Sequence, residues 1–144
     1  MTPDVNVLIY ATRPEYRQHA AAEAWLRTAV RAATRAAPFT VLPAVVVGYV
    51  RLVTDRRAHP EPTPTAEALA NVADLLEQPN VRLATHGDEW PRVVELCDKH
   101  RLAGRILGDA WIAASVLQLN EHLVTFDRDF RRLLPPRHLT ILSA

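Results

Sequence analysis

Short apolar segments alternate with amphipathic helical segments along most of this 144-residue sequence. Each apolar run is only a few residues long and rich in β-branched side chains, as buried strands are. We expect strands at residues 4–11, 39–42, 81–85, 122–126 and 139–142. The first of these segments begins as a strand, and whether it continues as a helix is left open. We expect helices at residues 14–36, 43–54, 65–77, 88–100 and 108–119, with Thr65 and Asp88 as caps. This alternation predicts a three-layer α/β domain with a mainly parallel central sheet flanked by helices.

The bulk properties fit one globular domain over residues 1–144. Hydrophobic residues make up 49% and charged residues 23% of the chain, and no apolar run approaches the roughly 18 residues of a membrane span. The N-terminal M-T-P-D-V-N has an acid where a secretion signal has basic residues, and Cys97 alone excludes an internal disulfide. We therefore expect a cytoplasmic protein without a membrane segment. The proline-rich residues 55–64 are interpreted as a loop within this domain.

The charge balance neither requires nor excludes a nucleic-acid partner. The net charge is +1, but 16 of the 17 basic residues are arginine. A GC-rich genome explains this bias, and arginine also suits bidentate contacts to phosphate. Arg128, Arg131 and Arg132 are candidates to hold an RNA backbone, although a solvated basic face explains them nearly as well.

Acidic residues stand at the tips of the predicted elements. In L-V-T-F-D-R-D-F, Asp127 and Asp129 follow a buried strand, and Asp109 opens a helix in G-D-A-W-I-A-A. Helix caps and turns use aspartate freely, so each of these has a simple structural explanation. Asp4 is harder to explain, because an acid within an apolar strand is costly to bury without a partner.

A parallel α/β sheet can bring Asp4, Asp109 and Asp127 together, since ligands in such folds bind beyond the carboxyl ends of the strands. Like charges about 4 Å apart repel by roughly 4 kcal/mol at an effective dielectric of 20. Such a cluster must take up protons, be matched by cations or bind a metal. Oxygen ligands suit Mg²⁺ or Mn²⁺, which commonly complete their shells with phosphate oxygens. The pattern therefore points to metal-assisted phosphodiester hydrolysis.

Three blocks of the sequence together resemble the signature blocks of PIN-domain ribonucleases. They are D-V-N-V-L-I-Y-A near the start, G-D-A-W-I-A-A in the last third and L-V-T-F-D-R-D-F after it. The T-D-R-R and P-T-P segments before Ala66 are also similar to those of VapC-type toxins of bacterial toxin–antitoxin pairs. The resemblance spans nearly the whole chain.

This resemblance implies an Mg²⁺-dependent (or Mn²⁺-dependent) endoribonuclease toxin that cuts structured RNA, often transfer or ribosomal RNA. A small antitoxin protein would hold it inactive, and a homodimer is expected. By position, Asp4, Asp109 and Asp127 are then the catalytic, metal-binding acids. Asn6 and Thr125 would support them, and Asp129 would be an accessory.

The chain departs from the family in its second block. The family pattern resembles P-x-x-x-x-E-x-x-R, whereas this chain reads P-A-V-V-V-G-Y-V-R, with Gly48 at the position of the glutamate. The surrounding sequence demands no kink or close helix crossing that would explain a glycine here. One interpretation is therefore that an acid of the active site has been lost and the enzyme is attenuated. A PIN-fold protein that binds antitoxin or RNA without cutting is the alternative. A phosphoacceptor or phosphatase domain with Asp4 as nucleophile ranks last, because the only lysine, Lys99, lies in a different helix.

Overall fold

The computed structural model describes residues 1–85, 87 and 89–143, and its five strands are short. The strands are β1 (Thr2–Pro3), β2 (Phe39–Val41), β3 (Val81–Leu83), β4 (Leu123–Thr125) and β5 (Leu139–Ile141). The helices are α1 (Val5–Thr12), α2 (His19–Ala32), α3 (Pro43–Val53), α4 (Thr65–Leu76), α5 (Trp90–His100) and α6 (Ile106–Gln118). Two 3₁₀ turns, η1 (Arg128–Arg132) and η2 (Pro136–His138), precede β5. The predicted α/β class is confirmed.

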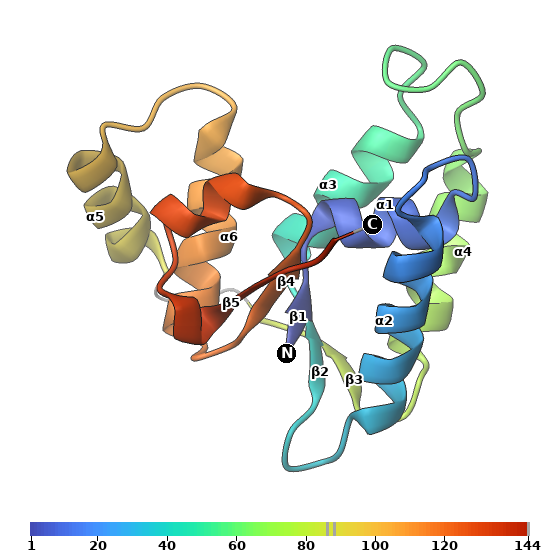
Figure 1. The fold of residues 1–144 in the computed structure, drawn as a ribbon, viewed down its shortest axis with the longest axis horizontal. Coiled ribbons are helices and arrows are strands. Elements are labelled where there is room, and N and C mark those ends of the chain that lie inside the picture. The colour runs from blue at the N-terminus through green and yellow to red at the C-terminus, as the bar shows by residue number, and fades with distance from the viewer. Residues whose placement is uncertain (86, 88, 144) are drawn as a thin grey trace.

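All strand pairs within the sheets are parallel. One sheet has the order β1-β4-β5 and the other consists of β2 and β3. The Thr40 amide donates to the Met1 carbonyl at 3.0 Å, so β2 lies beside β1 and the order across both sheets reads β3-β2-β1-β4-β5. The chain leaves β1 toward β2 and leaves β4 toward β5, in opposite directions (Figure 1). The switch point between β1 and β4 is where such folds open a ligand crevice.

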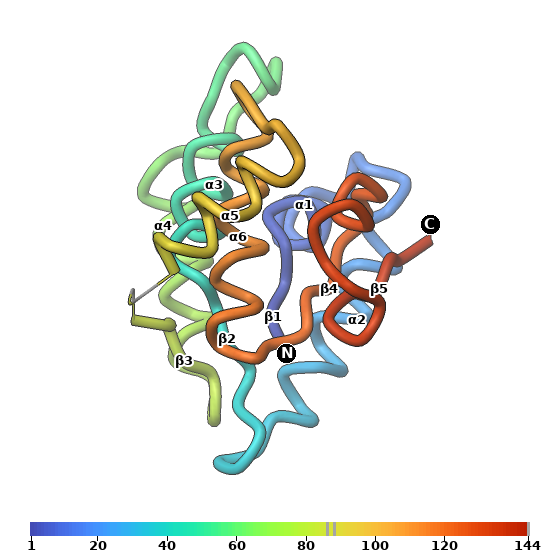
Figure 2. Tube along the Cα trace, turned by 90° about the vertical axis from the view of Figure 1, so that its left-hand side faces the viewer, coloured from blue at the N-terminus to red at the C-terminus, as the bar shows by residue number. Residues whose placement is uncertain are grey.

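The helices cover both sides of the strands. Helices α1 and α2 lie on one side of β1, and α3 to α6 lie on the other (Figure 2). The core takes its largest share from α6, where Ile112, Ala113, Ala114 and Val116 are buried. This helix is apolar nearly all round, as expected for one buried between other layers. None of the helices in the described part of the chain is long and apolar enough to cross a membrane.

Several predicted boundaries are wrong. The strand expected to begin at Asp4 ends before it, at Pro3, and Asp4 caps a helix instead of lying in a strand. The helical continuation that was left open for residues 4–11 is found as α1. The helix expected at 14–36 begins only at His19, because turns occupy the residues after Pro14. Thr65 is the first residue of α4, whose cap is Pro64. The predicted cap Asp88 lies outside the described residues.

Candidate active site

Asp4 lies at the carboxyl end of β1 and begins α1. Its Oδ1 accepts a hydrogen bond from the Val5 amide at 2.7 Å, which explains the acid locally as a helix N-cap. Its Oδ2 accepts two more, from Thr125 Oγ1 at 2.6 Å and Asn6 Nδ2 at 2.8 Å. The side chain is only 4% exposed. A cap alone would not need this burial, so Asp4 is held in one orientation by three donors.

Thr125 and Asn6 tie the ends of β1 and β4 together. Asn6 Nδ2 also donates to Thr125 Oγ1 at 2.9 Å, and Asn6 Oδ1 accepts from the Phe126 amide at 3.2 Å. Thr125 Oγ1 accepts in turn from the Asp127 amide at 2.9 Å. The structure therefore brings both supporting residues of the sequence prediction into contact with Asp4, and one hydroxyl links Asp4 to the backbone of Asp127.

Asp127 and Asp129 differ in their surroundings. Asp127 caps η1, since its Oδ1 accepts from the Asp129 amide at 2.8 Å, and its side chain is partly buried. Asp129 is exposed to solvent. The structural explanation as a turn cap holds for Asp127, but it does not account for the position of Asp127 beside Asp4 at the switch point between the strands.

The acids act on one another electrostatically. The pKa of Asp4 is raised to about 6, chiefly by burial and also by the charges of Asp109 and Asp127, while the hydrogen bonds from Thr125 and Val5 oppose the rise. The pKa of Asp109, in the first turn of α6, is also raised, first by burial and then by Asp127 and Asp129, while Arg105 opposes the rise. Asp4, Asp109 and Asp127 are thus close enough to share one electrostatic field.

The donor chemistry of this cluster fits a hard cation. Its ligands would be carboxylate oxygens, and a cation would relieve the mutual repulsion that raises these pKa values. Within residues 1–85, 87 and 89–143, however, no three His, Cys, Asp or Glu side chains converge closely enough to hold one ion. The three acids therefore match Mg²⁺ or Mn²⁺ in chemistry and general placement, without forming a closed ligand cage.

Comparison with known proteins gives the family. The PIN-domain family model matches residues 1–133. The chain belongs to the PIN-domain family. Ribonuclease VapC33 of Mycobacterium tuberculosis is 36% identical over 134 residues, which cover 90% of each chain. Ribonuclease VapC31 of the same species is 33% identical over 137 residues, 94% of each chain, so the chain is a VapC-type member of the family.

A solved structure confirms the PIN fold. It is a crystal structure of VapBC2 from Rickettsia felis, bound to a DNA fragment from the VapBC2 promoter. The TM-score is 0.65, and the match covers 97% of this chain and 96% of that chain at 15% identity. This likeness supports the fold alone.

Gly48 of this PIN domain has a packing reason that the sequence did not reveal. A Cβ atom at this position would lie 2.7 Å from Val5 Cγ2 and 3.4 Å from Val5 Cγ1. Helices α1 and α3 therefore cross closely where Gly48 faces Val5, beside Asp4. The expectation that no close helix crossing demands the glycine is wrong. Since valine is short and stiff at χ1, the contact cannot be relieved as it could be against a long flexible side chain.

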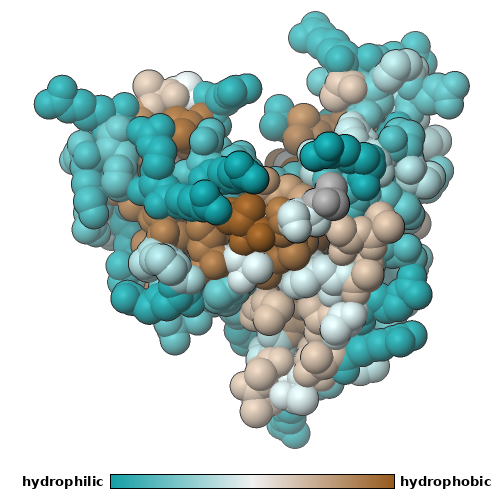
Figure 3. Space-filling model, in the orientation of Figure 1, coloured by the Kyte–Doolittle hydropathy of each residue, from teal (hydrophilic) through white to brown (hydrophobic). Residues whose placement is uncertain are grey.

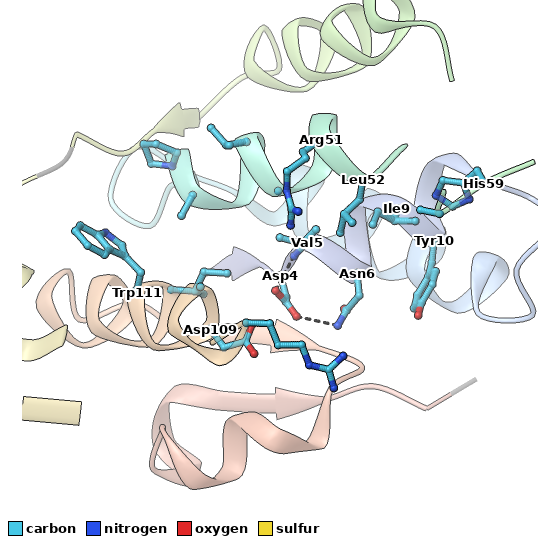
Figure 4. Close-up of a pocket in the computed structure, with 18 of the residues that line it drawn as sticks. Asp4, Val5, Asn6, Ile9, Tyr10, Arg51, Leu52, His59, Asp109 and Trp111 are labelled. Carbon is cyan, nitrogen blue, oxygen red and sulfur yellow. Dashed lines mark hydrogen bonds between the residues drawn. The ribbon is translucent and has the colours of Figure 1, made fainter. Parts of the chain in front are cut away.

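A cavity of about 730 Å³ opens beside the acids of the PIN domain. Helices α1, α3 and α6 and the loop at Ala58 and His59 line it, and Figure 3 shows the molecule hollowed between the α3 and α6 sides. In Figure 4, Asp4, Asn6 and Asp109 point toward one another, and the Arg51 guanidinium reaches down from α3 toward Asp4. Asp4 and Asp109 thus form one wall of a much larger site, whereas Asp127 does not line the cavity.

Sequence reasoning missed the other walls of this cavity. Tyr10, Tyr16 and His59 line it, and Arg51 and Arg105 reach it from α3 and α6. Tyr10 follows Asn6 by one helical turn, and this spacing was the available signal for its position on the same face of α1. His59 had no such signal, because it lies in the loop between α3 and α4 and reaches the site only through the tertiary fold.

Proposed function

We propose that this protein is a metal-dependent endoribonuclease, the toxin of a type II toxin–antitoxin pair, acting on structured RNA of the transfer or ribosomal class. The observation that carries the proposal is the mutual charge repulsion of Asp4, Asp109 and Asp127 at the crevice between β1 and β4. The relatives named as VapC ribonucleases over 90% or more of the chain support the same activity.

The proposed roles follow from the contacts of each residue. Asp4, Asp109 and Asp127 would hold Mg²⁺ or Mn²⁺, which activates a water and neutralises charge on the phosphate when bound. Thr125 and Asn6 orient the Asp4 carboxylate by donating to its Oδ2. Asp129 is exposed and would act only as an accessory. Arg105 and Arg51 line the same cavity and would bind phosphate oxygens of the RNA backbone.

The direct test is RNA cleavage by matched variants. Asp109→Asn should cleave at least about a hundredfold more slowly, because it removes a metal-binding charge. A hundredfold loss corresponds to roughly 2.7 kcal/mol in the activation barrier. Asp98→Asn, on the exposed face of α5, is the control and should cleave like the unaltered protein. Activity should require Mg²⁺ or Mn²⁺ and disappear with a chelator. Equal cleavage by the Asp109 and Asp98 variants would exclude the proposed roles.

Metal binding can be measured without activity. A cation that binds only the folded protein raises the melting temperature by mass action. Mg²⁺ and Mn²⁺ should therefore stabilise the unaltered protein, and Asp4→Asn and Asp109→Asn should both reduce the shift. An undiminished shift in both variants would remove the metal site from the proposal.

Gly48 distinguishes an attenuated enzyme from a non-cutting binder. The position provides no carboxylate, so we propose weak metal binding and slow cleavage. Gly48→Glu alone would press on Val5, and therefore the restoring variant is Val5→Ala combined with Gly48→Glu. This pair should tighten metal binding and increase cleavage over Val5→Ala alone. The alternative function, binding of antitoxin or RNA without cleavage, is favoured if neither protein cuts with any divalent metal.

We also propose an antitoxin partner and a homodimer. Val47 on α3 is 65% exposed and lines the cavity, so α3 would offer the groove for a C-terminal segment of the antitoxin. Helix α2, which we expected to share this groove, lies on the opposite side of β1 (Figure 2). Light scattering should give a dimer at micromolar concentration, and the antitoxin encoded beside the gene should raise the melting temperature. A strict monomer that the antitoxin fails to stabilise would contradict both parts.

A further inference from the structure

Four aromatic rings form a continuous row beside the acids. Phe126 meets Tyr10 edge to face at 5.3 Å between ring centroids, and Tyr10 meets Tyr16 at 4.9 Å. Tyr16 meets the His59 imidazole at 6.1 Å and 89°. The aromatic row (Phe126, Tyr10, Tyr16, His59) draws on the end of β4, helix α1, the turn before α2 and the loop after α3. Three regions far apart in sequence supply the rings, since Tyr10 and Tyr16 are only six residues apart.

One end of the aromatic row is adjacent to the acids. Phe126 directly precedes Asp127 in the chain. The pKa of the Tyr10 phenol is raised, first by burial, then by Tyr16, and then by the charges of Asp127 and Asp4. Tyr10, Tyr16 and His59 line the cavity that Asp4 and Asp109 also line. Figure 4 shows Tyr10 and His59 beyond Asn6 on the side away from Trp111. The cavity therefore runs from a charged wall to an aromatic one.

The far end of the aromatic row is held in place. His59 is buried, and its Nδ1 lies 3.4 Å from the Tyr16 hydroxyl. Arg13 fastens the loop that carries His59, since it donates to Thr63 Oγ1 and to the Glu61 carbonyl, both at 2.9 Å. Tyr10 and Tyr16 remain partly exposed toward the cavity. The row thus combines rings that are held in place with two tyrosines that are partly exposed to the cavity, as a site for a flat ligand requires.

We propose that the aromatic row is a nucleobase subsite, which stacks an unpaired base next to the phosphate that the acids cleave. The proposal rests on the RNA-cleaving function above and adds where the substrate's base lies. Unpaired RNA bases are commonly recognised by stacking on aromatic side chains, and every base has a face that can stack. A phosphate at a metal held by Asp4 and Asp109 carries its own nucleoside, and the aromatic part of the same cavity is a neighbouring surface for the attached base.

An apolar peptide segment is the competing occupant of this wall. The observations favour a base, because the row ends beside the acids proposed to hold the metal and carries phenol and imidazole groups that can hydrogen-bond to base edges. Burial lowers the pKa of His59, so its imidazole stays neutral and can accept as well as donate a hydrogen bond. A purely apolar segment would offer these phenol and imidazole groups no hydrogen-bond partner beyond the contact between Tyr16 and His59.

Base stacking can be detected by fluorescence in an RNA that is not cut. The probe is a short single-stranded RNA with 2-aminopurine placed at each position in turn, mixed with Asp109→Asn protein and Mg²⁺. One position should be quenched on binding. Tyr16→Leu, which keeps apolar bulk but no ring, should abolish that quenching and weaken RNA binding about tenfold, whereas Tyr16→Phe should keep both. Trp25→Leu removes an aromatic ring on α2, which does not line this cavity, and should change neither.

RNA cleavage by protein that keeps Asp109 shows whether the proposed base subsite or the proposed ribonuclease function is wrong. An abasic nucleotide at the quenched position should slow cleavage of the RNA, and Tyr16→Leu should show no such discrimination. Unchanged quenching in Tyr16→Leu overturns the subsite even if cleavage is normal. Quenching without any cleavage overturns the proposed function and leaves the subsite. Absence of quenching at every position, with antitoxin binding lost in Tyr16→Leu, assigns the wall to a peptide and overturns the proposal.

Discussion

At the scale of single residues, the proton on Asp4 links the site to stability. The pKa of Asp4 rises from its ordinary 3.8 to about 6 in the folded protein, chiefly through burial. The folded state thus holds this proton more tightly, and the stabilisation is complete below about pH 4 and lost as the pH rises through about 6. We expect urea denaturation in a chelator to show a loss on the order of 3 kcal/mol across this window.

A neighbouring charge tests the cause of this pH dependence. Asp109→Asn removes a like charge, so the pKa of Asp4 should fall and the window should move to lower pH. Asp98→Asn, on exposed α5, should leave the profile in place. If Asp4→Asn has the same pH profile as the unaltered protein, the titrating group is not Asp4.

Gly48 tests whether packing outweighs helix propensity at one position. Alanine is favoured over glycine in a helix by about 1 kcal/mol. Gly48→Ala should nevertheless destabilise the protein by about 1–3 kcal/mol, because its Cβ would lie 2.7 Å from Val5 Cγ2. Gly108→Ala is the matched control, since it lies in α6 with nothing within 4 Å of a Cβ, and it should stabilise. Adding Val5→Ala to Gly48→Ala should cost less than the two separate changes together.

At the scale of elements, Arg13 determines how firmly the loop between α3 and α4 is held. Its guanidinium donates to Thr63, to the Glu61 carbonyl and to Glu15. Arg13→Ala should speed hydrogen exchange of the Ala58 and His59 amides, both bonded to the Asp55 carbonyl, with a cost of about 1 kcal/mol. Arg17→Ala, at an exposed position in the same turn, is the control. Unchanged exchange in Arg13→Ala would show that the loop is held by its own packing.

At the scale of the whole molecule, Glu121 joins the two sheets at the edge opposite the acids. It accepts from Thr40 Oγ1 of β2 and from the Met1 ammonium, both at 2.5 Å. Burial would raise the pKa of Glu121, but these hydrogen bonds outweigh burial and lower it. Its stabilisation is therefore present above its ordinary pKa and lost as the pH falls through the lowered value, opposite in sign to Asp4.

Replacement of Glu121 should weaken the joint between the sheets. Glu121→Gln removes charge from a buried site with a cationic partner, so we expect a loss of about 1–3 kcal/mol in thermal or urea unfolding at neutral pH. Glu95→Gln, on the exposed part of α5, should have little effect. A Glu121→Gln protein as stable as the Glu95→Gln protein would show that β1 and β2 are held together by their backbone and core contacts.

The amino-acid sequence determined the order of the elements and the placement of the acids at their ends. Hydrophobic periodicity and turn residues are local properties, so α3 and β4 lie within one residue of their predicted bounds. The periodicity of residues 4–11 fits a strand or a helix, and it was the Val5 hydrogen bond to Asp4 that selected the helix. Capping geometry of this kind depends on backbone angles that a pattern of residue types does not specify.

Only the tertiary structure decided which distant residues meet. Thr125 reaches Asp4 across 121 positions of sequence, and His59 reaches Tyr16 across 43. The close approach of Gly48 to Val5 is likewise a property of how two helices cross, and helical pattern alone does not state which residue of one helix faces which residue of the other. The acids could be named as candidates from the sequence, because Asp4 and Asp127 follow strands, Asp109 lies in the first turn of a helix, and all three lie in blocks that resemble the PIN family. The aromatic row could not, because Phe126 and His59 come from distant parts of the chain that only the packed fold brings to Tyr10 and Tyr16.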